Sequence, residues 1–169
     1  MTDAHIRDIS ERDFVRVLTI NDESVKVLSP LSLDSLRALH GETVYCRGVS
    51  VADQIVAFVL AFSEGAHYAS MNYRWFADRY ARFLYVDRIV VDRRYRRNGL
   101  GRSLYTDLFR FAHGSAAERI TCEIDVDPPN EASRRFHARY GFRTVGTHRL
   151  VGGRLVAMQE LGLPILSAG

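Results

Sequence analysis

The sequence predicts a mixed α/β fold made of a single domain, residues 1–169. Its length supports one domain, because 169 residues fall within the roughly 100–200 residues that a domain usually has. Its 47% hydrophobic and 25% charged residues are typical of a globular protein, which excludes a disordered or collagen-like chain. Apolar runs rich in β-branched residues alternate with segments of helical periodicity, and this alternation indicates both strands and helices.

The N-terminal segment is predicted to form a short strand followed by a helix. Residues 4–9 are the candidate strand. Ser10 offers a helix cap, and Phe14, Val17 and Leu18 then fall on one face of the helix that follows. These three apolar side chains are the candidates for the buried face of that helix.

A second helix and a hairpin are predicted next. Ser32 offers a cap for a helical segment over residues 33–39. Residues 43–51 and 54–62 are rich in β-branched residues, and the short Ala52-Asp53 turn between them predicts two antiparallel strands.

The centre of the chain holds a strand–loop–helix–strand unit. Residues 83–91 and 119–126 are apolar candidate strands, and residues 101–113 between them have helical periodicity. The helix-spaced apolar residues of this segment are Leu104, Leu108 and Phe111.

The C-terminal part is predicted to form one helix and two strands. Residues 130–140 have helical spacing with Phe136 facing inward, and Gly141 ends the helix. Residues 142–151 and 154–161 are candidate strands, joined by a turn at two glycines.

Charge and hydropathy exclude several classes of partner. The formal net charge is only +3 and no RNA-binding motif is present, so nucleic acid is not an expected partner. The longest apolar run, residues 55–62, is far shorter than the ~20 residues that cross a bilayer. The N-terminus lacks the basic start and apolar stretch of a secretory signal. We therefore expect a cytoplasmic protein with no membrane partner.

The cysteines and histidines predict neither a metal site nor a redox site. Cys46 and Cys122 lie inside apolar strand-like runs, where buried inert thiols are expected rather than a disulfide or a reactive site. The 6 histidines show no metal-ligand spacing, and neither an HxxxH nor a CxxC motif occurs. We expect no bound metal.

Residues 90–102 give the strongest indication of a binding site. A strand enters a tight turn with Gly99 and Gly101 that opens a helix, so unpaired backbone N–H groups and the helix dipole favour an anion. Nearby arginines add charged donors. These features suit a pyrophosphate; the alternative is a solvated basic turn that binds nothing. Dinucleotide and Walker patterns are not matched, because Leu104 replaces the third glycine and this stretch contains no lysine.

Two motifs, Arg96-Arg97-Asn98-Gly99-Leu100-Gly101 and a second over residues 130–142, resemble those of the GCN5-related N-acetyltransferase (GNAT) superfamily. The first motif is similar to the family pattern Gln/Arg-x-x-Gly-x-Gly/Ala, although Arg97 replaces a common glycine and Asn98 a common arginine. The second begins at Asn130 and ends at Gly141-Phe142, and it resembles Asn-x-x-Ala/Ser-x-x-Phe/Leu-Tyr/His-x-x-x-Gly-Phe.

The resemblance implies the GNAT fold, a central and mostly antiparallel mixed β-sheet flanked by helices. It also implies acetyl-CoA as the cofactor, with its diphosphate on the glycine turn and its pantetheine arm along the preceding strand. The residues to which the resemblance assigns cofactor binding are Ile89, Val90, Val91, Arg96, Arg97, Asn98, Gly99, Leu100, Gly101, Arg102, Ser103, Asn130, Ser133, Arg135 and Phe136.

Asp87 is the predicted general base of the reaction, directly or through a water molecule. It lies in an otherwise apolar strand, where a carboxylate is costly unless it is paired or functional. By the resemblance, it also matches a position that is often acidic in the family. The alternative is a structural ion pair with Arg88 or another residue.

The general acid is expected at His137 or Tyr140. Many relatives carry a tyrosine where this chain has His137, and the tyrosine hydroxyl reaches the cofactor sulfur. An imidazole can serve as an acid near neutral pH, and Tyr140 lies close to one helical turn away. The alternative for His137 is a purely structural place in its helix.

By the resemblance, residues 65–82 are expected to shape the acceptor pocket. This connection is longer than the roughly 2–5 residues of an ordinary hairpin, and it combines aromatic residues with arginines. The substrate-binding candidates are Tyr73, Trp75 and, on the following strand, Arg88. The alternative is a short helix that packs its aromatic face on the sheet.

Together these features predict an N-acetyltransferase that moves an acetyl group from acetyl-CoA to the primary amine of a small molecule or amino acid. Direct attack in a ternary complex is the expected mechanism. Two other functions stay open, namely acetylation of a protein N-terminus or lysine and acyl-CoA sensing without turnover. A homodimer is also left open.

Overall fold

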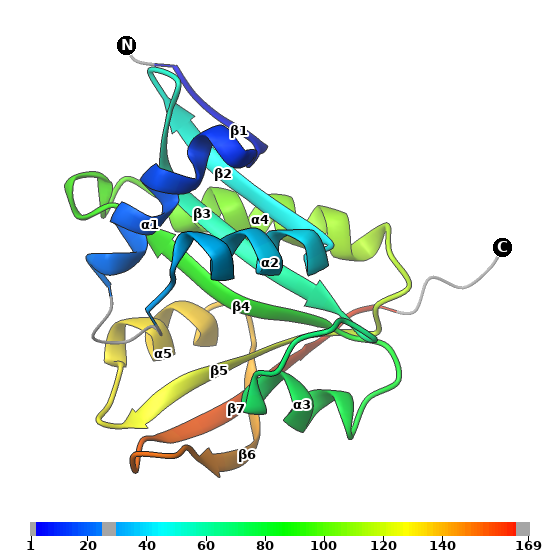
Figure 1. The fold of residues 1–169 in the computed structure, drawn as a ribbon. Coiled ribbons are helices and arrows are strands. Elements are labelled where there is room, and N and C mark those ends of the chain that lie inside the picture. The colour runs from blue at the N-terminus through cyan, green and yellow to red at the C-terminus, as the bar shows by residue number, and fades with distance from the viewer. Residues whose placement is uncertain (1–2, 25–29, 165–169) are drawn as a thin grey trace, which may run out of the picture. The chain divides into compact units, whose positions relative to one another are not determined.

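The chain divides into two compact units. The computed structural model describes residues 3–24 and 30–164 (Figure 1). The first unit comprises Met1–Phe62 and Val86–Phe111, and the second comprises Ser63–Tyr85 and Ala112–Gly169. Strand β4, Leu84–Val91, contributes residues to both units.

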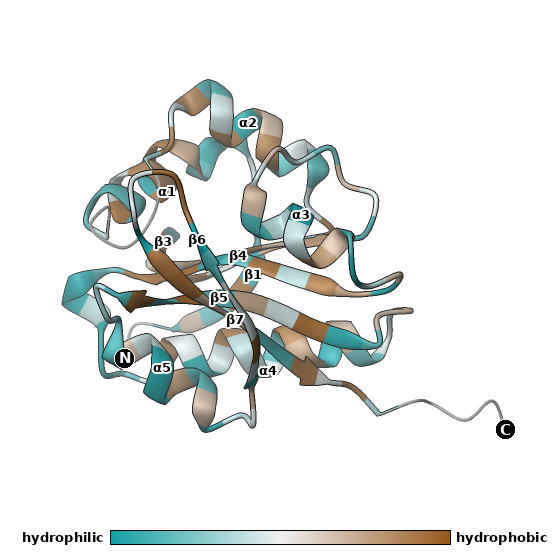
Figure 2. Cartoon of the chain, turned by 90° about the horizontal axis from the view of Figure 1, so that it is seen from below, coloured by the Kyte–Doolittle hydropathy of each residue, from teal (hydrophilic) through white to brown (hydrophobic). Residues whose placement is uncertain are grey.

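The first unit has helices on both faces of its strands. The bounds are β1 Ala4–Asp8, α1 Phe14–Asp22, α2 Leu33–Glu42, β2 Tyr45–Val51, β3 Gln54–Ser63 and α4 Leu100–His113. The strand order is β1-β2-β3-β4, with antiparallel pairing of β1 with β2 and of β2 with β3. Helices α1 and α2 lie on one face of these strands, and α4 lies on the other (Figures 1 and 2).

The hydrophobic core of the first unit joins α1, α2 and the strands. Phe14 and Val17 are buried, as the helical spacing predicts, and Leu18 packs against the edge of this core. Residues 55–62 of β3 are all buried, and the strand is apolar along its length (Figure 2). A continuous apolar run of this kind is typical of a strand that is covered on both faces.

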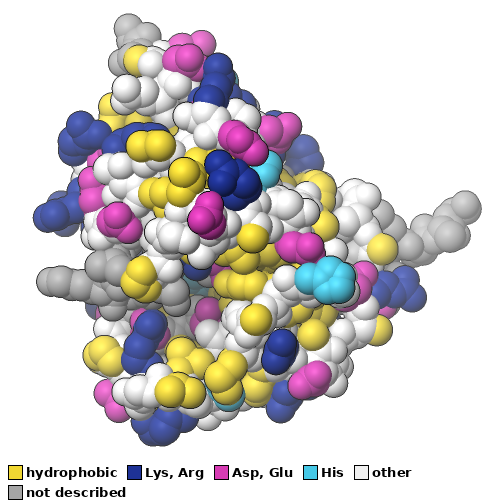
Figure 3. All heavy atoms as spheres, in the orientation of Figure 1, with side chains coloured by type: hydrophobic (Ala, Val, Ile, Leu, Met, Phe, Trp, Pro, Cys, Tyr) yellow, Lys and Arg dark blue, Asp and Glu magenta, His cyan; other side chains and the backbone are white. Residues whose placement is uncertain are grey.

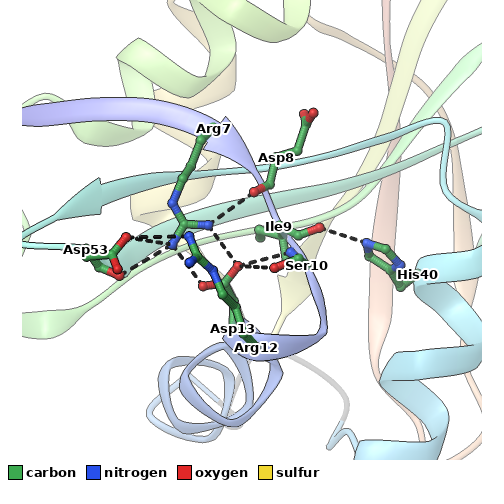
Figure 4. A network of polar contacts seen from close by, with 8 residues as sticks. All are labelled: Arg7, Asp8, Ile9, Ser10, Arg12, Asp13, His40 and Asp53. Carbon is green, nitrogen blue, oxygen red and sulfur yellow. Dashed lines mark hydrogen bonds and ion pairs between the residues drawn. The ribbon is translucent and has the colours of Figure 1, made fainter.

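A polar network fixes the junction between β1 and α1 (Figure 4). The Arg7 guanidinium donates to both Asp13 carboxylate oxygens at 2.8 and 2.9 Å, and the Ser10 backbone N–H donates to Asp13 at 3.0 Å. The Arg7 hydrogen bonds lower the pKa of Asp13 to about 2. His40 of α2 donates to the Ile9 carbonyl at 2.9 Å. The predicted cap at Ser10 is therefore part of a wider network that sets where α1 begins.

The second unit surrounds a shorter set of strands with α3 and α5. The bounds are α3 Met71–Ala77, β5 Arg119–Asp127, α5 Glu131–Ala138, β6 Arg143–Arg149 and β7 Leu155–Gly162. The strand order is β4-β5-β7-β6. Strands β4 and β5 are parallel, whereas β7 is antiparallel to both β5 and β6. The parallel pair is the one whose strands are connected through a helix, as parallel strands require.

The mixed α/β fold class with mostly antiparallel strand pairs and flanking helices is confirmed. The turn between β6 and β7 lies at Gly152 and Gly153, whose φ angles are +95° and +93°. These angles lie in the left-handed region that glycine adopts without steric cost. The two-glycine turn is therefore formed as the sequence predicts.

Two packing predictions from helical periodicity are wrong. On α5 (Glu131–Ala138) the buried residue is His137, whereas Phe136 is half-buried, so the inward face of the helix is displaced by one residue. On α4, Leu104 and Leu108 are buried as expected, but Phe111 is 38% exposed. Its neighbour Ala112 is buried instead, so the buried face of α4 ends one residue later than predicted.

The face of the molecule that carries α1 and α2 mixes charges of both signs (Figure 3). On α2, Arg37 lies 3.3 Å from Asp34 and 3.8 Å from Glu11. Surface pairs of this kind contribute little to stability, and they make this face mixed rather than uniformly basic. Within residues 3–24 and 30–164, the helices are too short or too polar to cross a bilayer.

Candidate functional site

The predicted phosphate-binding turn presents backbone donors that lack protein acceptors. After β4, residues Arg93–Tyr95 form a short 3-10 turn and α4 begins at Leu100. The first hydrogen bond of α4 runs from the Ser103 N–H to the Gly99 carbonyl at 3.0 Å. The N–H groups of residues 100–102 precede this bond and meet no acceptor in the described part of the chain. They are therefore available to an anion.

Two residues in the left-handed region shape this turn. The φ angle is +74° at Gly99 and +67° at Arg97. No heavy atom lies within 4 Å of the place where a Cβ on Gly99 would be, so the space beside the donors is open. The positive end of the 14-residue helix α4 adjoins the same space. An open cradle of backbone donors at a helix N-terminus fits a pyrophosphate.

The exposed arginines of the turn differ in their contacts. Arg96 donates through Nε to the Val91 carbonyl at 3.2 Å and through Nη2 to the Ser24 hydroxyl at 3.3 Å. Arg96 therefore ties the turn back to the end of β4. Arg97 and Arg102 have no ion-pair partner among residues 3–24 and 30–164, so both guanidinium groups are available to phosphate oxygens.

A buried carboxylate at the end of β4 braces the turn. Asp92 is 0% exposed and accepts hydrogen bonds from Arg94, at 2.8 Å for the backbone N–H and 2.9 Å for Nη2, and from Arg16 of α1. The Asp92 N–H donates to the Val56 carbonyl at 2.9 Å, and Arg16 Nε donates to the Ile55 carbonyl at 3.0 Å. The hydrogen bonds from Arg94, with those from Arg16, lower the pKa of Asp92 to about 2. The turn is thus fixed to α1 and β3.

The predicted base, Asp87, is held in a buried ion pair with its neighbour in β4. Arg88 Nε donates to Asp87 Oδ2 at 2.6 Å, and both side chains are at most 5% exposed. Arg88 Nη1 also donates to Oδ1 of Asn21, a fully buried residue of α1, at 2.9 Å. The Arg88 guanidinium is buried and donates to protein side chains, and a contact of Arg88 with substrate stays a prediction.

Sequence reasoning gave no role to Asp92, Arg16 or Asn21. Asp92 carried a usable signal, because an acid directly after an apolar strand and before two arginines is suited to cap and brace the following turn. Arg16 and Asn21 gave no signal in the sequence that they contact the core, since a polar residue on an amphipathic helix usually faces solvent.

The β4 residues assigned to the pantetheine arm differ in burial. Val90 is 3% exposed and belongs to the hydrophobic core, whereas Ile89 and Val91 are half-buried. The Val90 side chain therefore serves packing, and a role for this position in cofactor binding rests on its backbone atoms.

In the second unit, Asn130 is the N-cap residue of α5. Its Oδ1 accepts from the Ser133 N–H at 3.2 Å, and its own N–H donates to the Asp125 carbonyl at 3.0 Å. This is an N-cap arrangement, and asparagine is among the preferred residues for it. The oxygen of the Asn130 side chain thus serves the helix, and a contact with a cofactor is left to its Nδ2 group.

His137 is enclosed rather than presented to a site. It is 4% exposed, its Nδ1 donates to the Ser133 carbonyl at 2.8 Å, and its ring meets Phe136 and Phe142 edge-on. Burial lowers the pKa of His137, so the ring is neutral near pH 7 and its one proton lies on Nδ1. Its other ring nitrogen then carries no proton to give, and the geometry favours the structural alternative for His137.

Tyr140 is the more accessible of the two acid candidates. It is half-buried, and its ring lies 5.3 Å from that of Phe136. Its backbone N–H donates to the His137 carbonyl at 3.0 Å, which ends the helix. Arg135, assigned to the cofactor, is exposed and pairs with Glu131 at 3.2 Å. The roles of Tyr140, Phe136 and Arg135 stay predictions.

The aromatic segment after β3 contains a packed helix, as the structural alternative foresaw. Tyr73 on α3 is 3% exposed. Its hydroxyl donates to the Ser63 carbonyl at 2.8 Å and accepts from the Ala66 N–H at 3.0 Å. Its ring packs against Phe83 and Tyr85. This side chain therefore holds the loop and the core together, and a contact of Tyr73 with substrate stays a prediction.

Trp75 is packed on β6. A Cβ added to Gly146 would come within 2.7 Å of the indole, so the missing side chain at Gly146 makes room for this ring. The Arg79 guanidinium covers the indole at 3.6 Å from the ring centroid, a favourable cation–π contact. The position supports packing of α3, and a contact of Trp75 with substrate stays a prediction.

A cavity of about 450 Å³ lies beside α3. It is lined by residues 65–69 together with Tyr73, Arg74 and Ala77. Its volume is within the range of small-molecule sites, which is roughly 300–1,000 Å³. The exposed Arg74 has no ion-pair partner among the described residues, so the cavity carries an unneutralised cation.

The cysteines are free in this structure. Burial raises the pKa of Cys46 to about 12 and that of Cys122 well above its ordinary value. Such thiols are poor nucleophiles near neutral pH. Among residues 3–24 and 30–164, no three His, Cys, Asp or Glu side chains are grouped closely enough to hold a metal ion.

Comparison with known proteins points to one family. The profile of the acetyltransferase (GNAT) family matches residues 6–142. A phosphinothricin N-acetyltransferase of Streptomyces coelicolor is 49% identical over 55 residues, 32% of this chain and 30% of that protein. An N-acetyltransferase of Streptomyces griseus is 43% identical over 54 residues, 32% of this chain and 27% of that protein. The matched segment thus spans less than a third of either relative.

Solved structures share the fold over nearly the whole chain. Ard1 from Thermoplasma volcanium has a TM-score of 0.78 at 18% identity, covering 95% of this chain and 98% of its own. The ribosomal-protein-S18-alanine N-acetyltransferase of Escherichia coli has a TM-score of 0.74 at 16% identity, covering 99% and 98%. Arabidopsis thaliana NAA60, solved with acetyl-CoA, has a TM-score of 0.74 at 14% identity, covering 95% and 99%.

Proposed function

Because the chain belongs to the acetyltransferase (GNAT) family, we propose that it transfers the acetyl group of acetyl-CoA to the primary amine of a small molecule. The observation that carries this proposal is the glycine turn, with its unpaired backbone donors and open space over Gly99. Acetyl-CoA carries the pyrophosphate that such a turn fits. Transfer by direct attack of the amine within a ternary complex is part of the proposal.

The turn and the start of α4 hold the carrier. The N–H groups of residues 100–102 bind the pyrophosphate oxygens, and Arg97 and Arg102 add charged donors. When bound, acetyl-CoA supplies the activated acetyl group. Holding two reactants in place is worth roughly 7–11 kcal/mol of the barrier, more than the about 10²–10⁴-fold of one positioned acid or base. Binding and positioning of the two reactants is therefore expected to contribute more to the rate than any one proton-transferring side chain.

Asp87 accepts the proton that the amine must lose, through a water molecule because its side chain is at most 5% exposed. Tyr140 donates a proton to the leaving group, since a phenol hydroxyl is a donor and the buried neutral His137 is unsuited to the task. Backbone N–H groups of Ile89 to Val91 are the proposed donors to the carbonyl oxygen.

The acceptor is a small molecule that carries a carboxylate or another anionic group. The cavity beside α3 supports this choice, because it has the volume of a small-molecule site and contains the unpaired cation of Arg74. The partial similarity to a phosphinothricin N-acetyltransferase, whose named acceptor is an amino acid, supports the same class.

The test is release of coenzyme A thiol, measured with acetyl-CoA and a panel of amines, with product masses recorded. The panel contains the amino acids, phosphinothricin, spermidine and a peptide with a free N-terminal alanine. We expect turnover with an amino acid or a related anionic amine, and a product 42 mass units heavier (one acetyl group) on its amine. Turnover with the peptide alone assigns the activity to proteins. Binding of acetyl-CoA without thiol release on any amine makes the protein an acyl-CoA sensor and overturns the proposal.

A further inference from the structure

A buried chain of hydrogen bonds links helix α1 to the proposed base. Asn21 is 0% exposed, and its Oδ1 accepts from Arg88 Nη1 at 2.9 Å. Arg88 Nε in turn donates to Asp87 Oδ2 at 2.6 Å. All three residues belong to the first unit. One guanidinium therefore connects an amide oxygen of α1 with the carboxylate of β4.

The pair in β4 is unusual for neighbours in a strand. Successive side chains of a strand point to opposite faces, yet Asp87 and Arg88 are in direct contact. Arg88 must bend back along the strand to reach Asp87, and a long flexible side chain does not hold such a conformation without a further contact. One such contact is with Asn21.

The planarity of the guanidinium explains how Asn21 acts at a distance. The donors of an arginine lie in a rigid plane, so fixing Nη1 against Asn21 also fixes the direction in which Nε points. A lysine in place of Arg88 has one ammonium and cannot reproduce this two-point geometry. The orientation of the Asp87 carboxylate is thus set from α1.

We propose that Asn21 and Arg88 are positioning residues that hold the Asp87 carboxylate in the orientation in which it takes the proton from the acceptor amine. The inference rests on the proposed function, in which Asp87 is the base. It gives Arg88 a role that differs from substrate binding, and it gives Asn21, which the mechanism otherwise leaves unused, a role in the rate. A buried ion pair alone is weak evidence for stability, which is why the test concerns the rate.

The experiment is a double-mutant cycle in kcat, measured with acetyl-CoA and the fastest acceptor of the amine panel. Asn21→Leu removes the acceptor oxygen at similar volume, and we expect kcat to fall about ten- to hundredfold, as misplacement of a reacting group does. The KM for acetyl-CoA is expected to stay the same, because the glycine turn is untouched. In the Asp87→Asn background, Asn21→Leu is expected to change kcat by less than about twofold, because the group it positions is gone.

Two further variants complete the design. Asn21→Asp keeps an oxygen for Arg88 and is expected to restore most of kcat, whereas Arg88→Lys is expected to behave like Asn21→Leu. Asp107→Asn is the matched control, because Asp107 also pairs with an arginine of the first unit, Arg47, at 2.7 Å but has no place in the mechanism. We expect its kcat to equal that of the wild type. If Asn21→Leu does not fold, Arg88→Lys carries the same cycle.

The outcomes separate this inference from the function on which it rests. A loss of kcat from Asn21→Leu that is equally large in the Asp87→Asn background shows a merely structural role and overturns the inference, while the acetyltransferase activity stands. An Asp87→Asn variant with unchanged kcat removes the base and the inference together. A wild type that turns over no amine overturns the proposed function itself.

Discussion

Two buried carboxylates of the first unit, Asp87 within β4 and Asp92 at its end, show how the same residue type takes different roles. Asp92 pairs with arginines from two separate elements, Arg16 on α1 and Arg94 in the turn. Asp87 instead pairs with its own neighbour in the strand, Arg88. Because Asp92 joins separate elements, its loss loosens the fold. The Asp87 pair also reaches α1, through the contact of Arg88 with Asn21, so the feature that distinguishes Asp87 from Asp92 is its proposed part in the reaction.

The largest expected effect is that of Asp87→Asn on the rate. The substitution keeps the shape of the side chain and removes its capacity to accept a proton, so kcat is expected to fall about 10²–10⁴-fold. The free energy of unfolding is also expected to fall, because the substitution leaves the buried Arg88 without its charge partner. Steady-state kinetics and urea unfolding of the same preparation measure both. A normal kcat would place Asp87 with Asp92 as a structural residue.

Asp92→Asn is expected to lower the free energy of unfolding by about 3 kcal/mol, because it removes the charge of a fully buried carboxylate that pairs with both Arg16 and Arg94. Urea unfolding measures this change. Asp34→Asn is the control, since Asp34 forms an exposed pair with Arg37 on α2, and such pairs contribute at most about 1 kcal/mol. Equal destabilisation by the two variants would contradict the bracing role of Asp92.

The loss of folding stability at low pH is expected to include a contribution from Asp92. Its pKa is lowered from 3.8 to about 2 in the folded protein, so it binds its proton less readily when folded than when unfolded. Its contribution is therefore complete above about pH 4 and is lost as the pH falls through 2. Between pH 5 and pH 2, the wild type is expected to lose about 2 kcal/mol more than Asp92→Asn does. If the free energy of unfolding fell equally with pH in the wild type and in Asp92→Asn, this contribution would be excluded.

The smallest expected effect is that of Arg97→Gly. Arg97 has a φ angle of +67°, which costs an ordinary residue about 1–2 kcal/mol and glycine almost nothing. The greater freedom of glycine in the unfolded chain offsets part of this gain. We expect the free energy of unfolding to rise by about 0.5 kcal/mol, measured by urea unfolding. A decrease would mean that the Arg97 side chain stabilises the turn by contacts that outweigh the strain.

The strands, the helices and the glycine turn could be predicted because each has a local cause in the sequence. Hydrophobic periodicity, caps at Ser10 and Ser32, and the two glycines between β6 and β7 determine structure over a few residues. The strand order β5-β7-β6 has no such cause, because it depends on packing between residues far apart in the chain. The resemblance to a family, rather than periodicity, indicated the sheet.

The site was predictable where backbone groups form it and less so where side chains do. The turn at Gly99 needs a positive φ and open space, and glycine indicates both. The contacts of Arg88 and Tyr73 could not be predicted, because a polar atom on an apolar element can face either a ligand or a protein partner. Only tertiary contacts distinguish the two cases, here those with Asn21 and with Ser63.

Calorimetric titration of coenzyme A tests the central claim most directly, with three proteins compared. The wild type is expected to show saturable binding, and Gly99→Asp is expected to show none, because it adds strain at a φ of +74° and a negative charge beside the pyrophosphate. Gly152→Asp is the matched control, since Gly152 has a φ of +95° and equally open surroundings, and its binding is expected to equal that of the wild type. Binding of equal affinity to wild type and Gly99→Asp, or no binding to the wild type, would contradict the account.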